Sequence, residues 1–238
     1  MLQIIVTKSF NNPNLPVSQI GSVMNLSNSI ATYEMIDGYD YSEKGHHLNT
    51  VGLTFDSMGL VGTGLDGAYA DTGLLEPDAY TVIVAFNAQI PPQTTQLWTT
   101  LGTATTPYNG ARQAVQTGKG LNSQAFAGDG TTGAAANLVS GAVTDMWEIY
   151  GFALNNTNMR TYRGSSNAFV EAAVVNNRRK SSYTMRIAGG YLAPHNLGII
   201  GHVGVFAVYD GVLTDAQIQE QVSKAKQLMK DRGATFSW

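Results

Sequence analysis

The sequence predicts an all-β fold: an antiparallel two-sheet jelly-roll sandwich that carries one C-terminal α-helix. Charged residues make up only 13% of the 238 residues, and small and neutral polar residues take their place. From residue 33 onward, short apolar runs alternate with Gly, Asn, Asp and Pro, which is typical of strands joined by tight turns. Many strands with no helices between them favour a sandwich over a parallel α/β sheet.

Five segments are predicted to be strands because they are rich in β-branched and aromatic residues and are bounded by turn formers. They are Val51–Phe55, Tyr80–Asn87, Gln96–Leu101, Met146–Leu154 and Val203–Tyr209. The second of them is apolar on both faces, which predicts a strand that is covered on both sides. Residues 102–145 have the weakest pattern, and two runs of small residues within them, Thr103–Pro107 and Gly128–Ala136, are expected to be loops.

The one predicted helix covers residues 214–232. Thr214 and Gln217 have the spacing of a capping box, in which each side chain bonds the backbone N–H of the other residue. Lys230 and Arg232 suit the negative end of the helix dipole, and Gly233 can end the helix in the left-handed conformation. Leu213 and Ile218 are placed as a hydrophobic staple, and the apolar face consists of Ile218, Val222, Ala225 and Met229. We expect this face to pack on the sandwich.

The first 32 residues differ from the rest and are interpreted as an N-terminal arm, which leaves residues 33–238 for the sandwich and its helix. Prolines and asparagines in Asn11–Pro16 disfavour both helix and central strand, so one short strand is expected, at Gln3–Thr7. The arm is nonetheless rich in apolar residues, which soluble monomers rarely leave exposed. We therefore expect it to cover its own sandwich or a partner, for example in a homo-oligomer.

Several classes of protein are disfavoured by the bulk composition. The net charge of −3 provides no broad basic field for nucleic acid, and no stretch approaches the length of a membrane span. The absence of cysteine excludes disulfides and thiolate chemistry. Lys8 ends the first apolar run too early for a signal peptide, so we expect synthesis in the cytoplasm. The basic run Arg178–Lys180 is interpreted as a solvated hairpin tip, with contact to an anionic polymer as the alternative.

The C-terminal third resembles a known family. The Gly-rich segment Met185–Gly190, followed by Gly201–Ile218, is similar to the C-terminal signature of laminin-G-like, concanavalin A-like domains. It departs from that signature at Gly211, where a basic residue is common. Upstream, Gly67–Gly73 before Tyr80–Phe86 matches the order of the family, and Trp147–Phe152 resembles its mid-domain tryptophan strand. The resemblance covers roughly residues 36–233 and implies a sandwich of the lectin-glucanase type, a fold on which both binding modules and enzymes occur.

The arm carries a second resemblance. Ile4–Pro13 is similar to the start of bacteriophage structural proteins that carry this sandwich. This implies a virion protein, such as a head fibre, decoration or tail-fibre component, that binds other virion proteins through the arm and host-surface glycans through the sandwich. A lectin-like carbohydrate-binding module of a cell is the alternative, and a signal or a linker to another domain would favour it.

A glycan-degrading enzyme is a further alternative. Hydrolysis on this fold needs closely spaced carboxylates that one strand aims into one cleft. The carboxylates nearest to Trp147 are Asp145 and Glu148, and their spacing of three residues would place them on opposite faces of a strand. The sequence therefore predicts no catalytic residues, and Trp147 is assigned to the core.

Loop aromatics are the candidates for sugar contact, because a pyranose face packs on a ring while polar neighbours bond its hydroxyls. The candidate sets are Trp98, Tyr108 with Asn109, and Tyr191 with His195 and Asn196. Ordinary packing is the alternative interpretation of each set.

Calcium is the one cofactor that the pattern admits. Asp66, Asp71 and Asp78 are expected on loops, where carboxylate and carbonyl oxygens suit a hard cation. No EF-hand spacing is present, and turn formation explains these aspartates equally well. No histidine pair has a metal-binding spacing.

Overall fold

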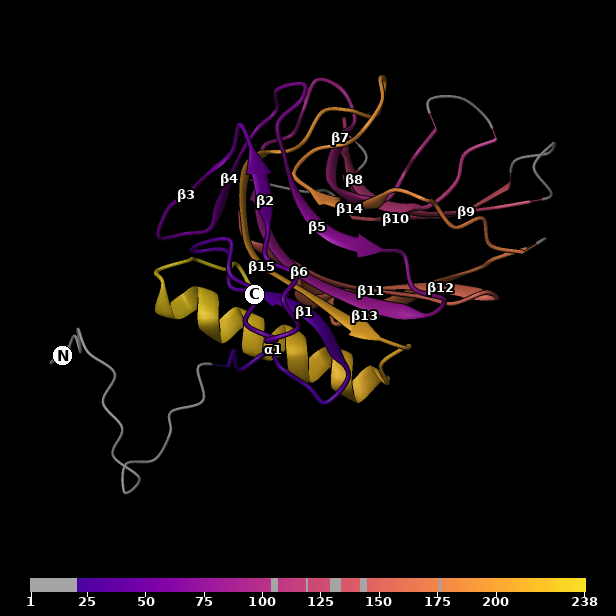
Figure 1. Cartoon of the computed structure of the whole chain (residues 1–238). Helices are drawn as coiled ribbons and strands as arrows, with labels where there is room; N and C mark the ends of the chain where they lie inside the picture. The colour runs from indigo at the N-terminus through magenta and orange to yellow at the C-terminus, as the bar shows by residue number, and fades with distance from the viewer. Residues whose placement is uncertain (1–20, 104–106, 119, 129–133, 142–144, 176) are drawn as a thin grey trace, which may run out of the picture.

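The fold is an all-β jelly-roll sandwich of two antiparallel sheets, covered on one side by a C-terminal helix. The computed structural model describes residues 21–103, 107–118, 120–128, 134–141, 145–175 and 177–238. Figure 1 shows three layers: one sheet, a second sheet beneath it, and helix α1 below the second sheet. This confirms the predicted fold class. Within the described residues, no helix is long and apolar enough to cross a membrane.

The sheet next to the helix, sheet A, contains eight strands among the described residues. Its order is β13-β12-β11-β6-β15-β4-β3, and β1 pairs with β15 outside this path. The strands are β1 (Ser29–Tyr33), β3 (Thr54–Phe55), β4 (Leu60–Thr63), β6 (Tyr80–Ala88), β11 (Glu148–Leu154), β12 (Asn158–Arg163), β13 (Ala168–Ala173) and β15 (Ile200–Asp210). Strand β6 is central and its residues are buried from Tyr80 to Phe86, as its two apolar faces predict.

The opposite sheet, sheet B, contains seven strands in the part of the chain that the structure describes. Its order is β10-β9-β8-β7-β14-β5-β2. The strands are β2 (Asn49–Val51), β5 (Tyr69–Leu75), β7 (Thr95–Thr99), β8 (Ala111–Gln116), β9 (Gly120–Ala127), β10 (Ala134–Ser140) and β14 (Thr184–Ile187).

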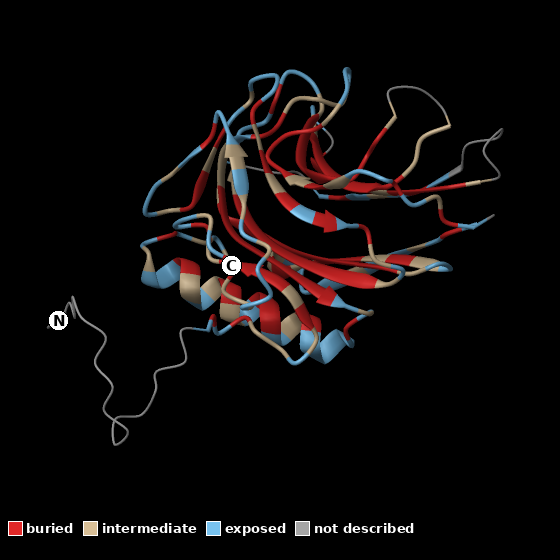
Figure 2. Ribbon diagram, in the orientation of Figure 1, coloured by how far each residue is buried: buried red, intermediate tan, exposed pale blue. Residues whose placement is uncertain are grey.

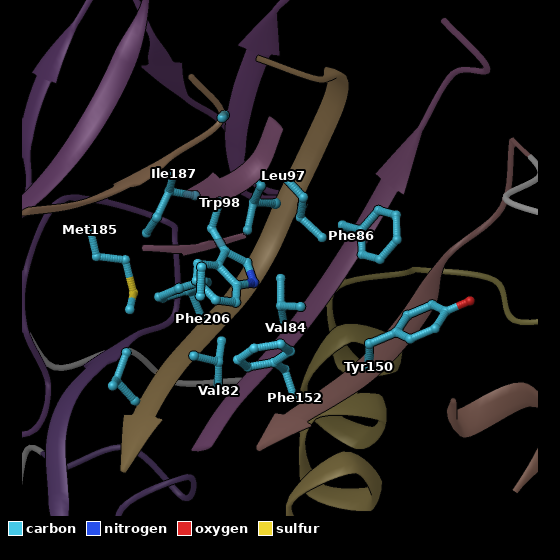
Figure 3. Packing of buried hydrophobic residues seen from close by; sticks show 14 of the residues in the cluster. Val82, Val84, Phe86, Leu97, Trp98, Tyr150, Phe152, Met185, Ile187 and Phe206 are labelled. Atoms are coloured by element: carbon cyan, nitrogen blue, oxygen red, sulfur yellow. The ribbon is translucent and has the colours of Figure 1, made fainter. Parts of the chain in front are cut away.

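The main core fills the space between the two sheets. Figure 3 shows Trp98 of sheet B among aromatic and aliphatic side chains that sheet A contributes. The Trp98 ring centroid lies 5.0 Å from that of Phe152, edge to face, and 6.4 Å from that of Phe206. Figure 2 shows the same distribution, with buried residues concentrated along the facing strands.

A second core lies between sheet A and helix α1 (Asp215–Asp231). The helix begins as predicted: Thr214 Oγ1 accepts a hydrogen bond from Gln217 N at 3.3 Å, and Thr214 N donates to Gln217 Oε1 at 3.0 Å. Gly233 follows the helix with a φ of 96°. The predicted apolar face is buried against the sheet, together with the staple residue Leu213 and with Trp147, which confirms its assignment to the core.

Residues 21–33 run along sheet A. Strand β1 pairs with β15, and the Tyr209 hydroxyl donates to the Met24 carbonyl at 2.8 Å. Met24 is fully buried in the core beneath the helix. The last part of the predicted arm thus packs on the sandwich of its own chain. Residues 1–20, with the strand predicted at Gln3–Thr7, lie outside the described residues.

Two local predictions are wrong. Residues 102–145, where no strand was predicted, contribute β8, β9 and β10, three of the seven strands of sheet B, and β10 begins within the loop predicted at Gly128–Ala136. The predicted strand Val51–Phe55 is divided at Gly52, whose φ is 65°, so that β2 joins sheet B and β3 joins sheet A. The first set of strands is rich in small residues, which give no local strand signal. A change from one sheet to the other within five residues cannot be recognised from an apolar run.

The basic run at 178–180 is also only partly solvated. The Arg178 side chain is fully buried and pairs with the equally buried Glu76, whereas Lys180 reaches the exposed Asp78. A hairpin tip in solvent is therefore the wrong interpretation of Arg178. This residue fastens the segment before β14 to the end of β5.

Candidate functional site

The outer face of sheet B carries a row of polar side chains that crosses the sheet from strand to strand. The cross-strand pairs join Asn49, Asp71, Arg186, Thr99, Arg112, Gln124 and Asn137 in that order. Residues that pair across neighbouring strands project to the same face, and Ile187 and Trp98, the next residues along their strands, lie in the core. At one strand spacing per step, this polar row is roughly 30 Å long.

Arg186 occupies one half of the row and is held between two tyrosine rings. Its guanidinium carbon lies 3.5 Å from the ring centroid of Tyr69 and 3.7 Å from that of Tyr191. Nε lies 3.4 Å from Asp71 Oδ2, and Nη1 donates to the Gly190 carbonyl at 3.0 Å. Stacking on both faces and the ion pair fix this side chain, and Asp71 balances its charge.

Two further groups extend this arrangement into a tyrosine cluster, which we define as Tyr69, Tyr183, Tyr191, Arg186, Asp71 and Thr184. The Tyr191 hydroxyl lies 2.7 Å from Thr184 Oγ1, which donates to Asp71 Oδ2 at 2.9 Å. The Tyr183 ring lies 4.5 Å from the Tyr191 ring, and 38% of Tyr183 is exposed. Burial raises the pKa of the Tyr191 phenol. The cluster thus offers an aromatic surface next to fixed hydrogen-bonding groups.

Arg112 occupies the middle of the row and is almost buried, with 6% of its surface exposed. Its Nε donates to Gln124 Oε1 at 2.7 Å, and its Nη1 lies 3.0 Å from His195 Nδ1. Burial lowers the pKa of this guanidinium to about 10, so it stays charged at neutral pH. Thr99 lies between Arg112 and Arg186 in the row, which separates the two cations by two strand spacings, roughly 10 Å.

His195 covers Arg112 from the loop between β14 and β15. Burial, and then the nearby Arg112 charge, lower the pKa of His195 to about 4, so the imidazole is neutral at pH 7. The Tyr108 ring lies 5.4 Å from the His195 ring, edge to face, and 5.2 Å from the Phe126 ring. Tyr108 therefore joins His195 over the middle of the sheet.

The loop that carries Tyr191 and His195 is held by backbone contacts at its base. Gly190 N donates to the Asn196 carbonyl at 2.9 Å, which closes the loop on itself. A Cβ added to Gly190 would collide with the His195 carbonyl, and one added to Gly198 would collide with the Ala188 carbonyl. Only glycine permits these approaches, so the two glycines determine where the loop crosses the sheet.

The structure places three of the predicted sugar-contact residues over the same face of sheet B: Tyr108, Tyr191 and His195. The two asparagines have local roles in this arrangement. Asn109 Oδ1 lies 3.3 Å from Gly102 N as an acceptor, and Asn196 closes the loop through its carbonyl. A contact of these residues with sugar stays a prediction.

Trp98 is a correction. It was grouped with the loop aromatics that could contact sugar, although a strand was predicted at Gln96–Leu101, and it lies in β7 with none of its surface exposed, at the centre of the main core (Figure 3). Its indole N–H donates to Gln113 Oε1 at 2.8 Å, which satisfies the polar atom of the ring inside the sandwich. A ligand on the surface cannot reach this side chain.

The three calcium candidates do not come together. Asp71 pairs with Arg186 in the polar row, and Asp78 pairs with Lys180 at 2.7 Å. Asp66 is exposed on the turn between β4 and β5. Within the described ranges, no group of three or more His, Cys, Asp or Glu side chains is placed to hold a metal ion. The turn and ion-pair roles account for these carboxylates.

Sequence reasoning missed Tyr69, Tyr183, Arg186 and Arg112. Tyr69 lies within Gly67–Gly73 and Tyr183 lies two residues before Met185–Gly190, the segments that carry the resemblance. Arg186 lies within the second of these segments. No sequence signal reveals that Arg186 and Arg112 share a face, because this depends on the register of three strands that are far apart in the chain.

Comparisons with known proteins support the fold and not a specific activity. No protein-family model and no curated protein sequence matches the chain. Among solved structures, the chain is similar to a mutant of Trypanosoma rangeli sialidase displaying trans-sialidase activity, with 11% identity over 88% of this chain and 35% of that one, at a TM-score of 0.64.

It is also similar to the binding domain of Paraclostridial Mosquitocidal Protein 1, with 8% identity over 82% of this chain and 52% of that one (TM-score 0.61). The receptor binding domain of botulinum neurotoxin type G matches at 9% identity over 83% and 51% (TM-score 0.58). The chain thus spans about half or less of the proteins that it matches, and what it shares with them is the two-sheet antiparallel sandwich.

Proposed function

We propose that this chain is a non-catalytic structural protein of a bacteriophage virion that binds host-surface glycans through the outer face of sheet B. The observation that carries the glycan-binding part is the tyrosine cluster. Tyr183 and Tyr191 present ring surface at the solvent boundary, and Asp71, Thr184 and Arg186 hold polar groups beside it. Pyranose rings bind to such combinations because their C–H faces pack on aromatic rings while their hydroxyls need directed partners.

The cluster is suited to binding because it is already formed. Arg186 is fixed by two rings, an ion pair and a backbone carbonyl, so few side chains would lose freedom when a ligand binds. The β14–β15 loop is closed by its own backbone hydrogen bond. A preformed, partly exposed aromatic surface on a sheet face is a reasonable basis for a lectin-like function.

The distribution of carboxylates supports a non-catalytic role. Among the residues that form the strands of sheet B, one is acidic, Asp71, and it pairs with Arg186. Glycoside hydrolysis needs one carboxyl group to donate a proton and a second to attack or to activate water. Glu148, the carboxylate near Trp147, is buried in sheet A in an ion pair with Arg163.

Direct binding measurements test the glycan-binding proposal. The purified full chain is applied to a glycan array, and hits are titrated by isothermal calorimetry. Tyr183→Ala should weaken binding at least tenfold, about 1.4 kcal/mol, because it removes the most exposed ring of the cluster. Tyr183→Phe should retain binding.

Tyr39→Ala is the matched control. Tyr39 is 44% exposed and contacts Tyr41 and His47, not the cluster. Equal loss of binding in both alanine variants, or no binding of the wild-type chain to any glycan, would contradict the proposal.

The virion part rests on the resemblance of Ile4–Pro13 and of the C-terminal signature, and on the low charge of the chain. Mass spectrometry of purified particles, made by the host that carries the coding sequence, should find the chain as a stoichiometric component. A chain that is found only in the cell lysate would favour the alternative, a cellular carbohydrate-binding module.

The arm is proposed to connect the chain to identical copies or to other virion proteins. Because residues 21–33 pack on their own sandwich, a deletion of residues 1–20 tests this without removing β1. The full chain should be an oligomer by light scattering or should be incorporated into particles, and the truncated chain should fail in both respects. Unchanged assembly of the truncated chain would exclude this role of the arm.

A further inference from the structure

Arg112 is the one buried arginine of the described residues that has no carboxylate partner. Five other arginines lie within 4.0 Å of a carboxylate oxygen: Arg160, Arg163, Arg178, Arg186 and Arg232. Arg179 also has no such partner, but it is only half-buried. A buried charge without a counter-ion is costly, because it has lost its hydration and gained no opposite charge.

The hydrogen bonds around Arg112 show what is missing. A guanidinium can only donate, so His195 Nδ1 must accept the 3.0 Å hydrogen bond from Arg112. In a neutral imidazole the proton then lies on Nε2. This His195 Nε2–H is fully buried and has no acceptor. Arg112 Nη2 has no acceptor either, and it is not among the polar atoms that are fully shielded from solvent.

The middle of the polar row therefore holds two donor groups that lack an acceptor, and one positive charge that lacks a partner. The buried His195 Nε2–H costs about 1–3 kcal/mol because it has no acceptor, whereas Arg112 Nη2 can still donate to water. A ligand group that supplies oxygen acceptors and one negative charge can bind at Arg112 Nη2, the donor that solvent reaches, and balance the charge there. Carboxylates fit because arginine binds them through two parallel hydrogen bonds.

We propose that Arg112 and His195 form a subsite for the carboxylate of an acidic sugar, one that lies on the same glycan that the tyrosine cluster binds. This inference rests on the proposed function and specifies its ligand. The positive charge of Arg186 is balanced by Asp71, so the polar row has a surplus of one positive charge. A monoanionic carboxylate matches that surplus, whereas a phosphate monoester would bring a second negative charge.

The two subsites lie on one face in a line. Arg186 and Arg112 are two strand spacings apart, roughly 10 Å, with Thr99 between them. Tyr191 and His195 belong to the same loop, so the neutral part and the acidic part of one oligosaccharide can contact one rigid element. Gln124 holds Arg112 in place through Nε and leaves Nη2 without a protein partner.

The binding test compares matched pairs of ligands. Sialylated and uronate-containing oligosaccharides are titrated by calorimetry against their methyl esters, which keep every atom of the sugar and lose the charge. The wild-type chain should bind the free acids at least tenfold more tightly. Arg112→Gln should abolish this preference while it leaves binding of the neutral esters unchanged. Arg160→Gln, which removes one positive charge from sheet A, should leave the preference intact.

A second measurement does not depend on binding of a whole glycan. Free glucuronate and N-acetylneuraminate are titrated while the imidazole resonances of His195 are followed by NMR, with inorganic sulfate as a second anion. The carboxylates should shift these resonances saturably, and Arg112→Gln should prevent the shift. His195→Gln, which keeps Arg112 and removes its hydrogen-bond acceptor, covers the case in which Arg112→Gln does not fold, and it is assayed by calorimetry, where it should reduce the preference for the free acids over their methyl esters.

The outcomes separate this inference from the proposed function. Equal affinity for acids and esters, with no response of His195 to either carboxylate, overturns the carboxylate subsite even where glycans bind. A saturable His195 response with no glycan binding on the array supports the subsite and contradicts the glycan-binding proposal. A response to sulfate that equals the response to the carboxylates overturns the assignment to a sugar acid and indicates a site for sulfate groups.

Discussion

The buried ion pair between Glu76 and Arg178 allows a quantitative test of what holds the site's sheet in place. Both side chains are fully buried, and Arg178 Nη2 lies 3.4 Å from Glu76 Oε1. Glu76 Oε2 lies 3.2 Å from Ser181 N as an acceptor, and Arg178 Nη1 donates to the Asp78 carbonyl at 2.7 Å. Burial raises the pKa of Glu76, and Arg178 opposes that shift. The pair joins the end of β5 to the segment that leads into β14.

Glu76→Gln keeps the shape of the side chain and removes its charge, so it leaves Arg178 as an uncompensated buried cation. The loss of one partner of a buried pair costs about 3–5 kcal/mol. For a chain of this length, 1 kcal/mol shifts the melting temperature by about 2–4 °C, so we expect a decrease of roughly 6–20 °C. Differential scanning calorimetry and urea unfolding measure it.

The double variant Glu76→Gln, Arg178→Met is the control, because it removes the unpaired charge. It should recover part of the lost stability, because it leaves no unpaired charge in the sandwich and the new amide can still accept the hydrogen bond from Ser181 N. A Glu76→Gln variant within 0.5 kcal/mol of the wild type would refute the reasoning. It would mean that the carboxyl group carries no charge in the folded chain.

Three further predictions concern the helix, pH and catalysis. Thr214→Ala should destabilise the chain by about 1 kcal/mol because it removes the cap, whereas Thr214→Ser should melt like the wild type. His195 stays neutral down to about pH 4 in the folded chain but takes up a proton below about pH 6.5 in the unfolded chain. The free energy of unfolding should therefore decrease as the pH is lowered from about 6.5 to 4. His195→Gln should remove this part of the pH dependence. Purified chain should release no reducing sugar from common polysaccharides, and activity that Asp71→Asn abolishes would contradict the non-catalytic proposal.

The elements that could be predicted from the sequence are those whose signals are local. The capping box and apolar face of the helix act within a few residues, and both are confirmed. The apolar residues on both faces of β6 predict that this strand is buried, and it is. By contrast β8, with the sequence ARQAVQ, has no local strand signal. It is a strand because Gln113 bonds Trp98 across the sheet and because Ala111 and Val115 fill the core, and both effects are tertiary.

The candidate site shows the same division. Tyr191 and His195 were found because a loop with aromatic and polar residues is visible in the sequence. Trp98 was misplaced although a strand was predicted at Gln96–Leu101, because the sequence does not show that this side chain faces the core. The sequence could not show that Arg112 and Arg186 lie on the same face of sheet B, because this depends on the register of β14, β7 and β8.

The residues that carry the family resemblance also have a physical role in the site. Gly189 and Gly190 end the Gly-rich segment, and a Cβ on either would collide with a backbone carbonyl, of Ala68 for the first and of His195 for the second. The backbone of the β14–β15 loop can therefore lie directly against β5 and against itself. Because the loop lies so close to the sheet, the Tyr191 ring stacks on Arg186 and His195 bonds Arg112. Each arginine of the polar row thus contacts one residue of this loop. Part of the segment that carries the resemblance thus also helps to build the candidate site, because the position of this loop depends on Gly189 and Gly190.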